Sequence, residues 1–132
     1  MQPYFKNDFV IIKYDKVNHV IIHRWIDTIT SAEFREGLNY LIPAMKLFKT
    51  GNIITDTTCM GIIHPDDQHW SVTNWFQKAL KAGYSKVAII VPDDDITRMS
   101  IEDTMNQARP FLFAYFDNMD EAIDWTKKLR II

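Results

Sequence analysis

The sequence predicts an α/β fold in which one mixed, mostly parallel β-sheet is covered by helices. Three observations predict it: two β-branched and aromatic runs joined by a short turn, apolar residues at helical spacing between later apolar runs, and the almost unbroken apolar run KVAIIV. Strands that alternate with helices form right-handed crossovers and therefore a parallel sheet. A strand that is apolar on both faces is typical of the buried centre of such a sheet.

The first two strands are predicted to form an antiparallel hairpin that leads into a helix. Residues 9–14 and 19–25 are the β-branched and aromatic runs, and the turn between them is short enough for a hairpin. Thr30 begins the sequence T-S-A-E, a capping box in which the Glu33 side chain reaches back to the Thr30 amide. Apolar residues at helical spacing follow this box, so we expect a long first helix.

This first helix is expected to break before the chain reaches the next strand. Pro43 lies inside the helical pattern, where it removes one backbone hydrogen bond and crowds the preceding turn, so we expect the break near Ile42. Gly51 fits the C-cap of the helix, because glycine readily adopts the left-handed conformation found there. Residues 52–56 are predicted to form the next strand.

The second half of the chain repeats the alternation of strand and helix. Asp66 or Asp67 starts the second helix and Gly83 ends it, because acidic residues suit the positive end of the helix dipole. The later elements are strand 86–91, a short helix over Ile101, Met105 and Ala108, strand 111–116, and a helix capped by Asp117 or Asn118. The predicted order is therefore ββαβαβαβα, with an antiparallel first strand, in one domain over residues 1–132.

Composition and charge indicate an ordinary globular protein. With 132 residues, of which 47% are hydrophobic and 24% charged, the chain is long enough to bury a core without disulfides. The formal net charge of −2 and the lack of a basic run argue against nucleic acid as a partner. Cys59 is the only cysteine, which excludes an intramolecular disulfide. No stretch resembles a signal sequence or a membrane span, so we expect a cytoplasmic protein without integral membrane association.

Several motifs spread over nearly the whole chain carry a resemblance to a known family. They are WID at 25–27, EFREGL at 33–38, IITD at 53–56, Asp67 and Trp70 with Trp75, GYSKVA at 83–88, and FDNMDEAIDW at 116–125. With these motifs the chain resembles the SpoIIAA-like, or STAS-domain, family, and most of all its divergent bacterial STAS/CRAL-TRIO-like branch. The resemblance implies a SpoIIAA-like superhelix of β–α units. It also implies one of two roles: phosphorylation-switched protein binding, as in the anti-sigma-factor antagonists, or binding of an apolar ligand.

The resemblance further implies a phosphoacceptor after the strand that ends at Asp56. The antagonists carry a phosphorylated serine in an Asp-Ser-Ser-Gly pattern at this place, and the residues here are Asp56, Thr57, Thr58 and Cys59, so Thr58 takes the acceptor position. A hydroxyl near a helix N-terminus places the phosphate beside free amides. Cys59 replaces the glycine, and residues 59–65 separate Thr58 from the helix. The alternative is that both threonines are turn residues that bond nearby backbone.

We expect no catalytic site, metal or cofactor. The metal-ligand residue types gather in two groups: His64, Asp66, Asp67 and His69, and then Asp93, Asp94 and Asp95. The two histidines lack the i, i+4 spacing of a helical metal site, and aspartates in a first turn suit the helix dipole. The three later aspartates are interpreted as a solvated loop. A hydrolase that uses Asp56, His64 and Asp93 is the weakest interpretation, because no nucleophile motif such as G-x-S-x-G is present.

The more promising candidate surface is apolar. At about 100° per helical residue, Trp70 and Trp75 point about 140° apart, so at least one of them should lie at the margin of the buried stripe. The stripe expected to face the core is Val72, Phe76, Ala79, Leu80 and Gly83. The loop before this helix is unusually apolar for a surface connection. The predicted partner or ligand surface is therefore Asp56, Met60, Ile62, Ile63, Trp70 and Trp75.

From these observations we expect a non-enzymatic, STAS-like regulatory domain of bacterial signalling. It would work through contacts with a protein partner, which is either another protein or a second copy in a homodimer. The alternative is CRAL-TRIO-like binding of a lipid or another apolar small ligand, with the same apolar residues lining the entrance. The orientation of the loop separates the two cases, because a loop folded back onto the core closes the groove and an exposed loop leaves it open.

Overall fold

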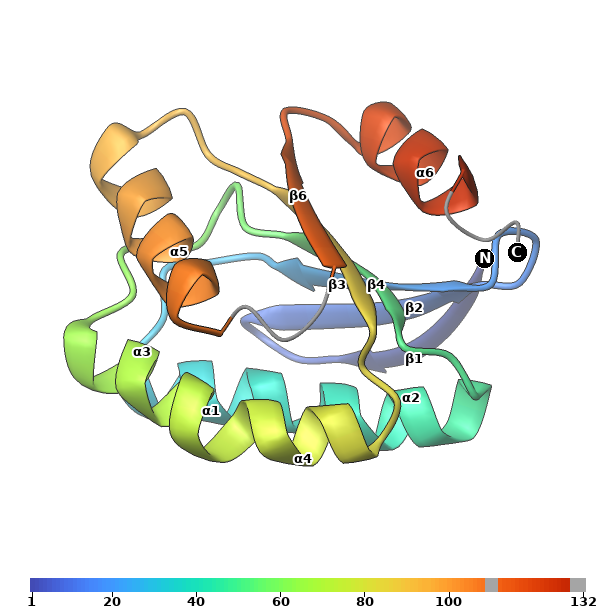
Figure 1. Ribbon diagram of the computed structural model, residues 1–132, viewed down its shortest axis with the longest axis horizontal. Helices are drawn as coiled ribbons and strands as arrows, with labels where there is room; N and C mark the ends of the chain where they lie inside the picture. The colour runs from blue at the N-terminus through green and yellow to red at the C-terminus, as the bar shows by residue number, and fades with distance from the viewer. Residues whose placement is uncertain (109–111, 129–132) are drawn as a thin grey trace.

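The computed structural model describes residues 1–108 and 112–128 as one six-stranded sheet with helices on both faces (Figure 1). The strands lie in chain order across the sheet. They are β1 (Gln2–Lys6), β2 (Val10–Asp15), β3 (Val20–Trp25), β4 (Asn52–Asp56), β5 (Lys86–Ile90) and β6 (Leu112–Phe116). The pairs β1–β2 and β2–β3 are antiparallel, and every later pair is parallel. The predicted mixed, mostly parallel α/β sheet is confirmed.

Strand β1 is an element that the sequence pattern did not predict. It pairs with β2 at the edge of the sheet, and its register shifts between Pro3 and Phe5. Proline and bulges are common on edge strands, where an N–H group can be missing without loss of a ladder bond. Tyr4 and Phe5 pack against the rings of Phe48 and Tyr40, and these contacts hold the strand in place.

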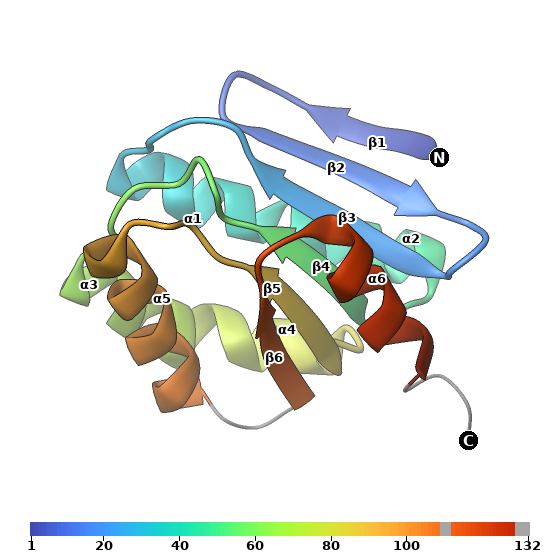
Figure 2. The same cartoon turned by 90° about the horizontal axis from the view of Figure 1, so that it is seen from above.

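Most helices cover one face of the sheet, which we call the major face. They are α1 (Ser31–Asn39), α2 (Leu41–Phe48), α3 (Pro65–Trp70), the π-helix η1 (Ser71–Trp75), α4 (Phe76–Lys81) and α5 (Asp95–Ala108). The opposite, minor face is covered by α6 (Met119–Lys128), which packs on β4, β5 and β6. Figure 2 looks onto the minor face and shows that the described helices leave β1 and β2 uncovered there.

The capping box and the break in the first helical segment are both confirmed. The Glu33 amide donates to Thr30 Oγ1 at 3.2 Å, and the Thr30 amide donates to Glu33 Oε1 at 3.0 Å. Helix α1 ends at Asn39 and α2 begins at Leu41, so the break lies where proline at position 43 withdraws an amide.

Gly51 was predicted to be the C-cap of this helical segment, but it does not cap α2. Lys49 adopts the left-handed conformation, with φ of 55°, and is the C-cap instead. Gly51 is required for close packing: a Cβ there would lie 1.6 Å from the Gly83 carbonyl oxygen. Gly83 itself has φ of 107° and follows α4, as expected for the end of that helix.

Two further boundaries differ from the prediction. Helix α3 begins at Pro65 with His64 as its N-cap, so the two aspartates lie inside the first turn rather than starting it. Helix α5 is 14 residues long and begins at Asp95, because Asp94 caps its N-terminus by accepting bonds from the Thr97 amide and hydroxyl. Asn118 caps α6 as predicted, through a 2.9 Å bond from the Glu121 amide. Phe111 of the predicted last strand lies outside the described residues.

The sheet separates two apolar cores of unequal size. The major-face core includes Trp25, Phe34, Met45, Trp75, Phe76 and Ile101. The minor-face core consists of Val20, Ile22, Ile54, Ala88, Ile90 and Ala122, with partly buried residues of α6 packed against it. Within the described residues, no helix combines the length and the apolar character that a membrane span requires.

Candidate functional site

The loop between β4 and α3 folds back onto the major-face core. Met60 and Ile63 are 6% and 7% exposed, whereas Ile62 between them is 50% exposed. The Ile63 amide donates to Ser100 Oγ of α5 at 3.1 Å, and Gln68 Nε2 donates to the Ile63 carbonyl at 2.9 Å. Met60 and Ile63 therefore do not belong to an open surface, contrary to the prediction, and Ile62 is the residue of this loop that presents its apolar side chain to solvent.

The two candidate phosphoacceptors have different environments. Thr57 is buried, and its hydroxyl donates to the Ile90 carbonyl at 2.7 Å, so this candidate phosphoacceptor is not accessible. Thr58 is exposed, and both its amide and its hydroxyl donate to Asp56 Oδ1, at 3.0 and 2.8 Å. Asp56 also lies 3.8 Å from Arg24 Nε. Thr58 is therefore accessible, but a phosphate there would meet the Asp56 carboxylate rather than the N-terminus of a helix.

The tryptophans behind the loop are divided by the π-helix. The Phe76 amide bonds the Ser71 carbonyl, an i to i+5 bond that widens one turn and shifts the phase of the helix. As a result Ser71 and Trp75 join Phe76 and Ala79 in the buried stripe, whereas Val72 is half-buried and Leu80 is exposed, contrary to the prediction.

Trp75 is an interior residue and Trp70 is the marginal one. Trp75 is 2% exposed, and its indole Nε1 donates to the Leu38 carbonyl of α1 at 2.8 Å. It is therefore not part of an exposed surface. Trp70 is half-buried, with the Arg35 guanidinium 5.1 Å from its ring centroid, so one tryptophan lies at the margin as the sequence predicted.

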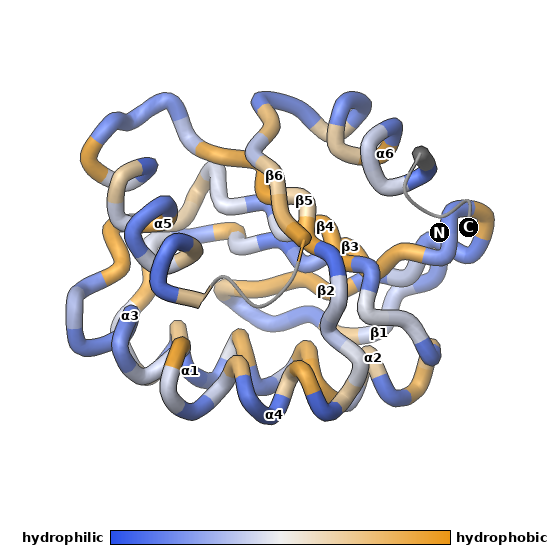
Figure 3. Tube along the Cα trace, viewed as in Figure 1, coloured by the Kyte–Doolittle hydropathy of each residue, from blue (hydrophilic) through white to orange (hydrophobic). Residues whose placement is uncertain are grey.

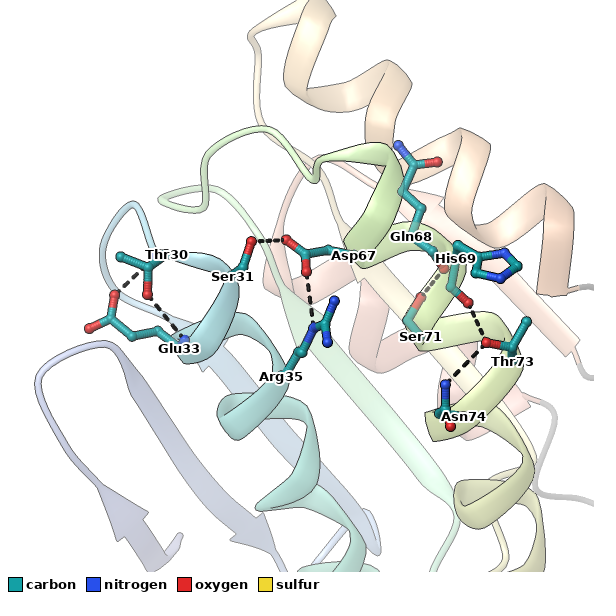
Figure 4. Close-up of polar contacts among 10 residues, drawn as sticks. All are labelled: Thr30, Ser31, Glu33, Arg35, Asp67, Gln68, His69, Ser71, Thr73 and Asn74. Carbon is teal, nitrogen blue, oxygen red and sulfur yellow. Dashed lines mark hydrogen bonds and ion pairs between the residues drawn. The ribbon is translucent and has the colours of Figure 1, made fainter.

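A polar cluster that sequence reasoning missed joins α1 to α3 (Figure 4). The Asp67 side chain is 4% exposed and accepts a 2.6 Å bond from the Ser31 hydroxyl and a 3.1 Å bond from Arg35 Nε. Arg35 is thereby held over Trp70. Arg35 and Asp67 are far apart in sequence. The position of Asp67 in the first turn of a helix was already explained by the helix dipole, so no local signal identified its pairing with Arg35.

The candidate metal and hydrolase residues do not assemble into a site. His64, Asp66 and His69 are exposed, and the Asp67 carboxylate is bound to Ser31 and Arg35. Among the residues that the structure describes, no three histidine, cysteine, aspartate or glutamate side chains lie close enough to hold a metal ion.

A cavity of about 70 Å³ lies in the major-face core behind the folded-back loop. Met60, Ile63 and Trp75, which were predicted to lie at an entrance, form part of its wall. Aromatic rings of β3, α1 and α4 complete the wall: Trp25, Phe34 and Phe76. The cavity is smaller than the roughly 300–1,000 Å³ of sites for drug-sized ligands, so it does not hold an extended lipid chain.

Burial shifts the pKa of two titratable groups in this core. His23 is fully buried beside Trp25, and desolvation lowers its pKa to about 4, although a 3.2 Å contact between Nε2 and the Gly37 carbonyl opposes the shift. Its Nδ1 has no partner among the described residues. Burial also raises the pKa of the Tyr84 phenol, which lines the cavity. Both groups are therefore neutral at physiological pH.

An exposed apolar patch lies outside this core, at the edge of the sheet where the parallel strands end. Ile62, Ile96 and Met99 are 50%, 63% and 59% exposed. The bond from the Ile63 amide to Ser100 Oγ holds the loop against the first turns of α5. Ile62 and Met99 are the sequence neighbours of these two bonded residues. Figure 3 shows the apolar segments of this loop and of the start of α5 at the same end of the molecule. We call these three residues the apolar patch.

Acidic side chains gather at the same end of the sheet as the apolar patch. Aspartates end or follow each of the parallel strands here, or lie in the first turn of α3: Asp27, Asp56, Asp66, Asp93, Asp94, Asp95 and Asp117. Two arginines at this end are already paired, Arg24 with Asp56 and Arg98 with Asp117 at 3.3 Å. The apolar patch and these aspartates therefore share the end of the sheet at which the parallel strands terminate, and we call the aspartates the acidic rim of the patch.

Comparison with known proteins supports the fold and nothing finer. No protein-family model and no curated protein matches the sequence. A similar solved structure is that of an uncharacterised protein of the DUF3478 family from Shewanella loihica PV-4, described as having a SpoIIAA-like fold. The two chains are 17% identical with a TM-score of 0.62, over 93% of this chain and 98% of the other. The chain therefore has a SpoIIAA-like fold, as its resemblance to the divergent STAS-like proteins implied.

Proposed function

We propose that this SpoIIAA-like domain is a non-enzymatic regulatory module that binds a partner protein through the apolar patch of Ile62, Ile96 and Met99. The observation that supports this proposal most is the exposure of three large apolar side chains on a loop and on the helix start to which a hydrogen bond joins that loop. Exposed apolar groups that gather under a polar rim are typical of protein interaction sites.

The charge around the patch limits the kind of partner. Because the rim is acidic, a partner with basic residues around an apolar centre is attracted to it and steered toward it. A second copy of this chain carries the same acidic rim and is repelled, so we favour a different protein over a homodimer at this surface. Thr58 is exposed at this rim, and its phosphorylation would add negative charge there.

Site-specific photocrosslinking in the source cells tests the proposal. A photoreactive residue in place of Ile62 should give one crosslinked protein, and the same product should form from position 99. Position 17 is the control, because Val17 is 88% exposed on the β2–β3 turn at the opposite end of the sheet. The product should disappear with Ile96→Asp and weaken as salt is raised.

Three outcomes would contradict the proposal. Crosslinks that form as readily from position 17 as from position 62 would remove the patch as the specific surface. A product of twice the mass of this chain would identify a second copy and remove the argument from the acidic rim. Absence of any product from positions 62 and 99 under several growth conditions would contradict the binding of a partner protein at this surface.

A further inference from the structure

The cavity in the major-face core has the size of a small organic molecule. Its volume is about 70 Å³, several times the roughly 10–15 Å³ that one water molecule needs. It therefore has space for about five to seven non-hydrogen atoms. None of the residues that line it carries a charged side chain. A neutral, compact and mostly apolar molecule fits these properties.

Thr55 is the polar side chain best placed to meet such a molecule. Of the lining residues, all are buried except Leu38 and Thr55. Thr55 lies on β4 between β3 and β5, on the face that the helices cover, so its accessible surface faces the cavity. Its hydroxyl makes no hydrogen bond to a described residue.

The other aliphatic hydroxyls of the wall are already committed. Thr57, Ser71 and Thr104 donate to the carbonyls of Ile90, Gln68 and Ser100 at 2.7, 2.7 and 2.8 Å. Each therefore offers a lone pair but no proton to the cavity. The Thr55 hydroxyl can both donate and accept, which makes it the natural partner for a single polar group on a ligand.

The wall is rich in aromatic rings, and the π-helix positions several of them. Trp25 and Phe34 face the cavity from β3 and α1. Trp75 faces it from the end of the π-helix, and Phe76 and Tyr84 from the segment that follows. The ring centroids of Trp75 and Tyr84 are 5.1 Å apart at an interplanar angle of 74°. A further ring placed beside them in the cavity can add edge-to-face contacts of the same kind.

We propose that this cavity is a binding site for a small neutral aromatic molecule that carries one hydrogen-bonding group, of the size of phenol, with that group bonded to the Thr55 hydroxyl. This site is separate from the apolar patch, because Ile62, Ile96 and Met99 do not line the cavity. A charged ligand is excluded by the uncharged wall, since burial of an unpaired charge is strongly unfavourable.

Titration with phenol and toluene tests the proposal, because the two molecules differ by a hydroxyl and a methyl group. Binding is followed by NMR of labelled Met60 and Met105 methyl groups, which line the cavity, and by the fluorescence of Trp25 and Trp75. A ligand of this size is expected to bind with a dissociation constant of about 1 mM. Thr55→Val keeps the shape of the wall and removes the hydroxyl, so it should weaken phenol binding by about 3–10-fold and leave toluene binding unchanged.

Two variants serve as controls. Thr73→Val makes the same chemical change at an exposed helical position and should leave both affinities unchanged. Ile62→Ser alters the apolar patch and should not affect either molecule. The proposal is overturned if neither molecule shifts the methionine methyl signals, or if the shifts occur at surface residues instead. An equal effect of Thr55→Val on phenol and toluene, or no effect on either, would also overturn it.

Discussion

The two faces of the sheet are covered by helices in different ways. The major face is covered by helical segments that arrive from different directions, and one of them contains a π-helix. A cavity remains where they meet the sheet. The minor-face core is covered by α6, and there the fully buried Ala88 of β5 and Ala122 of α6 permit close approach. The contrast teaches that free space, and with it the capacity to bind a ligand, arises here from helix convergence rather than from small side chains.

The two faces also differ in the kind of polar group that they bury. The buried His23 and the hydroxyls of Thr55, Thr57, Ser71 and Thr104 lie on the major face, whereas Asn52, Lys86 and Thr126 are buried on the minor face beside its aliphatic core. Buried polar groups cost free energy unless they are bonded. On the minor face, Lys86 Nζ donates to the Thr126 carbonyl of α6 at 3.0 Å, which satisfies part of this cost.

The largest difference is expected from removing one tryptophan from each face. Trp25 is 1% exposed and stacks on Phe34, so Trp25→Ala should lower the free energy of unfolding by about 3–5 kcal/mol. Trp125 is half-buried on α6 against Phe116, and Trp125→Ala should cost about 1–2 kcal/mol. Urea denaturation of both variants measures the difference. Equal losses would show that the minor face contributes as much stability as the major face.

The next effect concerns pH and belongs to the major face alone. The folded pKa of His23 is about 4 and its ordinary value is 6.5, so the unfolded chain binds the proton first as pH falls. Stability from the neutral imidazole is present above pH 6.5 and is lost as the pH falls toward 4, by about 3 kcal/mol. His23→Gln should therefore flatten the pH dependence of the unfolding free energy in this window, whereas His64→Gln, at an exposed position, should not. Identical slopes for His23→Gln and wild type would contradict the assignment.

The smallest of these effects compares two neighbouring residues of β5. Val87 faces the cavity and Ala88 faces α6, and both are fully buried. Val87→Ile should change stability by less than about 1 kcal/mol, because the added methyl enters free space. Ala88→Val should cost about 1–3 kcal/mol by overpacking. Thermal denaturation distinguishes them, and a greater loss for Val87→Ile would mean that the cavity collapses rather than accepts the methyl group.

Much of the fold was accessible from local patterns. The hairpin, the capping box at Thr30, the break caused by Pro43 and the buried strand at 86–90 depend on residues that are neighbours in sequence, and each is present in the structure. The C-cap at Gly51 was wrong because the close approach of Gly83, which is remote in sequence, also demands a glycine there. Strand β1 was missed because its apolar and polar residues do not alternate regularly. The register of its pairing with β2 shifts at a bulge between Pro3 and Phe5.

The candidate site could be predicted less well, because it also depends on contacts between residues that are remote in sequence. A fixed 100° per residue placed Val72 and Leu80 in the core, but the π-helix changed the phase and put Ser71 and Trp75 there instead. The loop residues Met60 and Ile63 were correctly identified as unusual, yet their direction depended on Ser100 and Gln68, which hold the loop against α5 and α3.

The sequence by itself determined the α/β class, the alternation of strands and helices after the hairpin, and the apolar character of the loop after β4, because these follow from composition and from periodicity along one segment. The tertiary structure alone decided which apolar residues are inside, where the cavity lies and that Thr55 faces it. Those properties depend on how segments far apart in the chain converge. Met60 is therefore buried, whereas Ile62, two residues later on the same loop, is exposed to solvent.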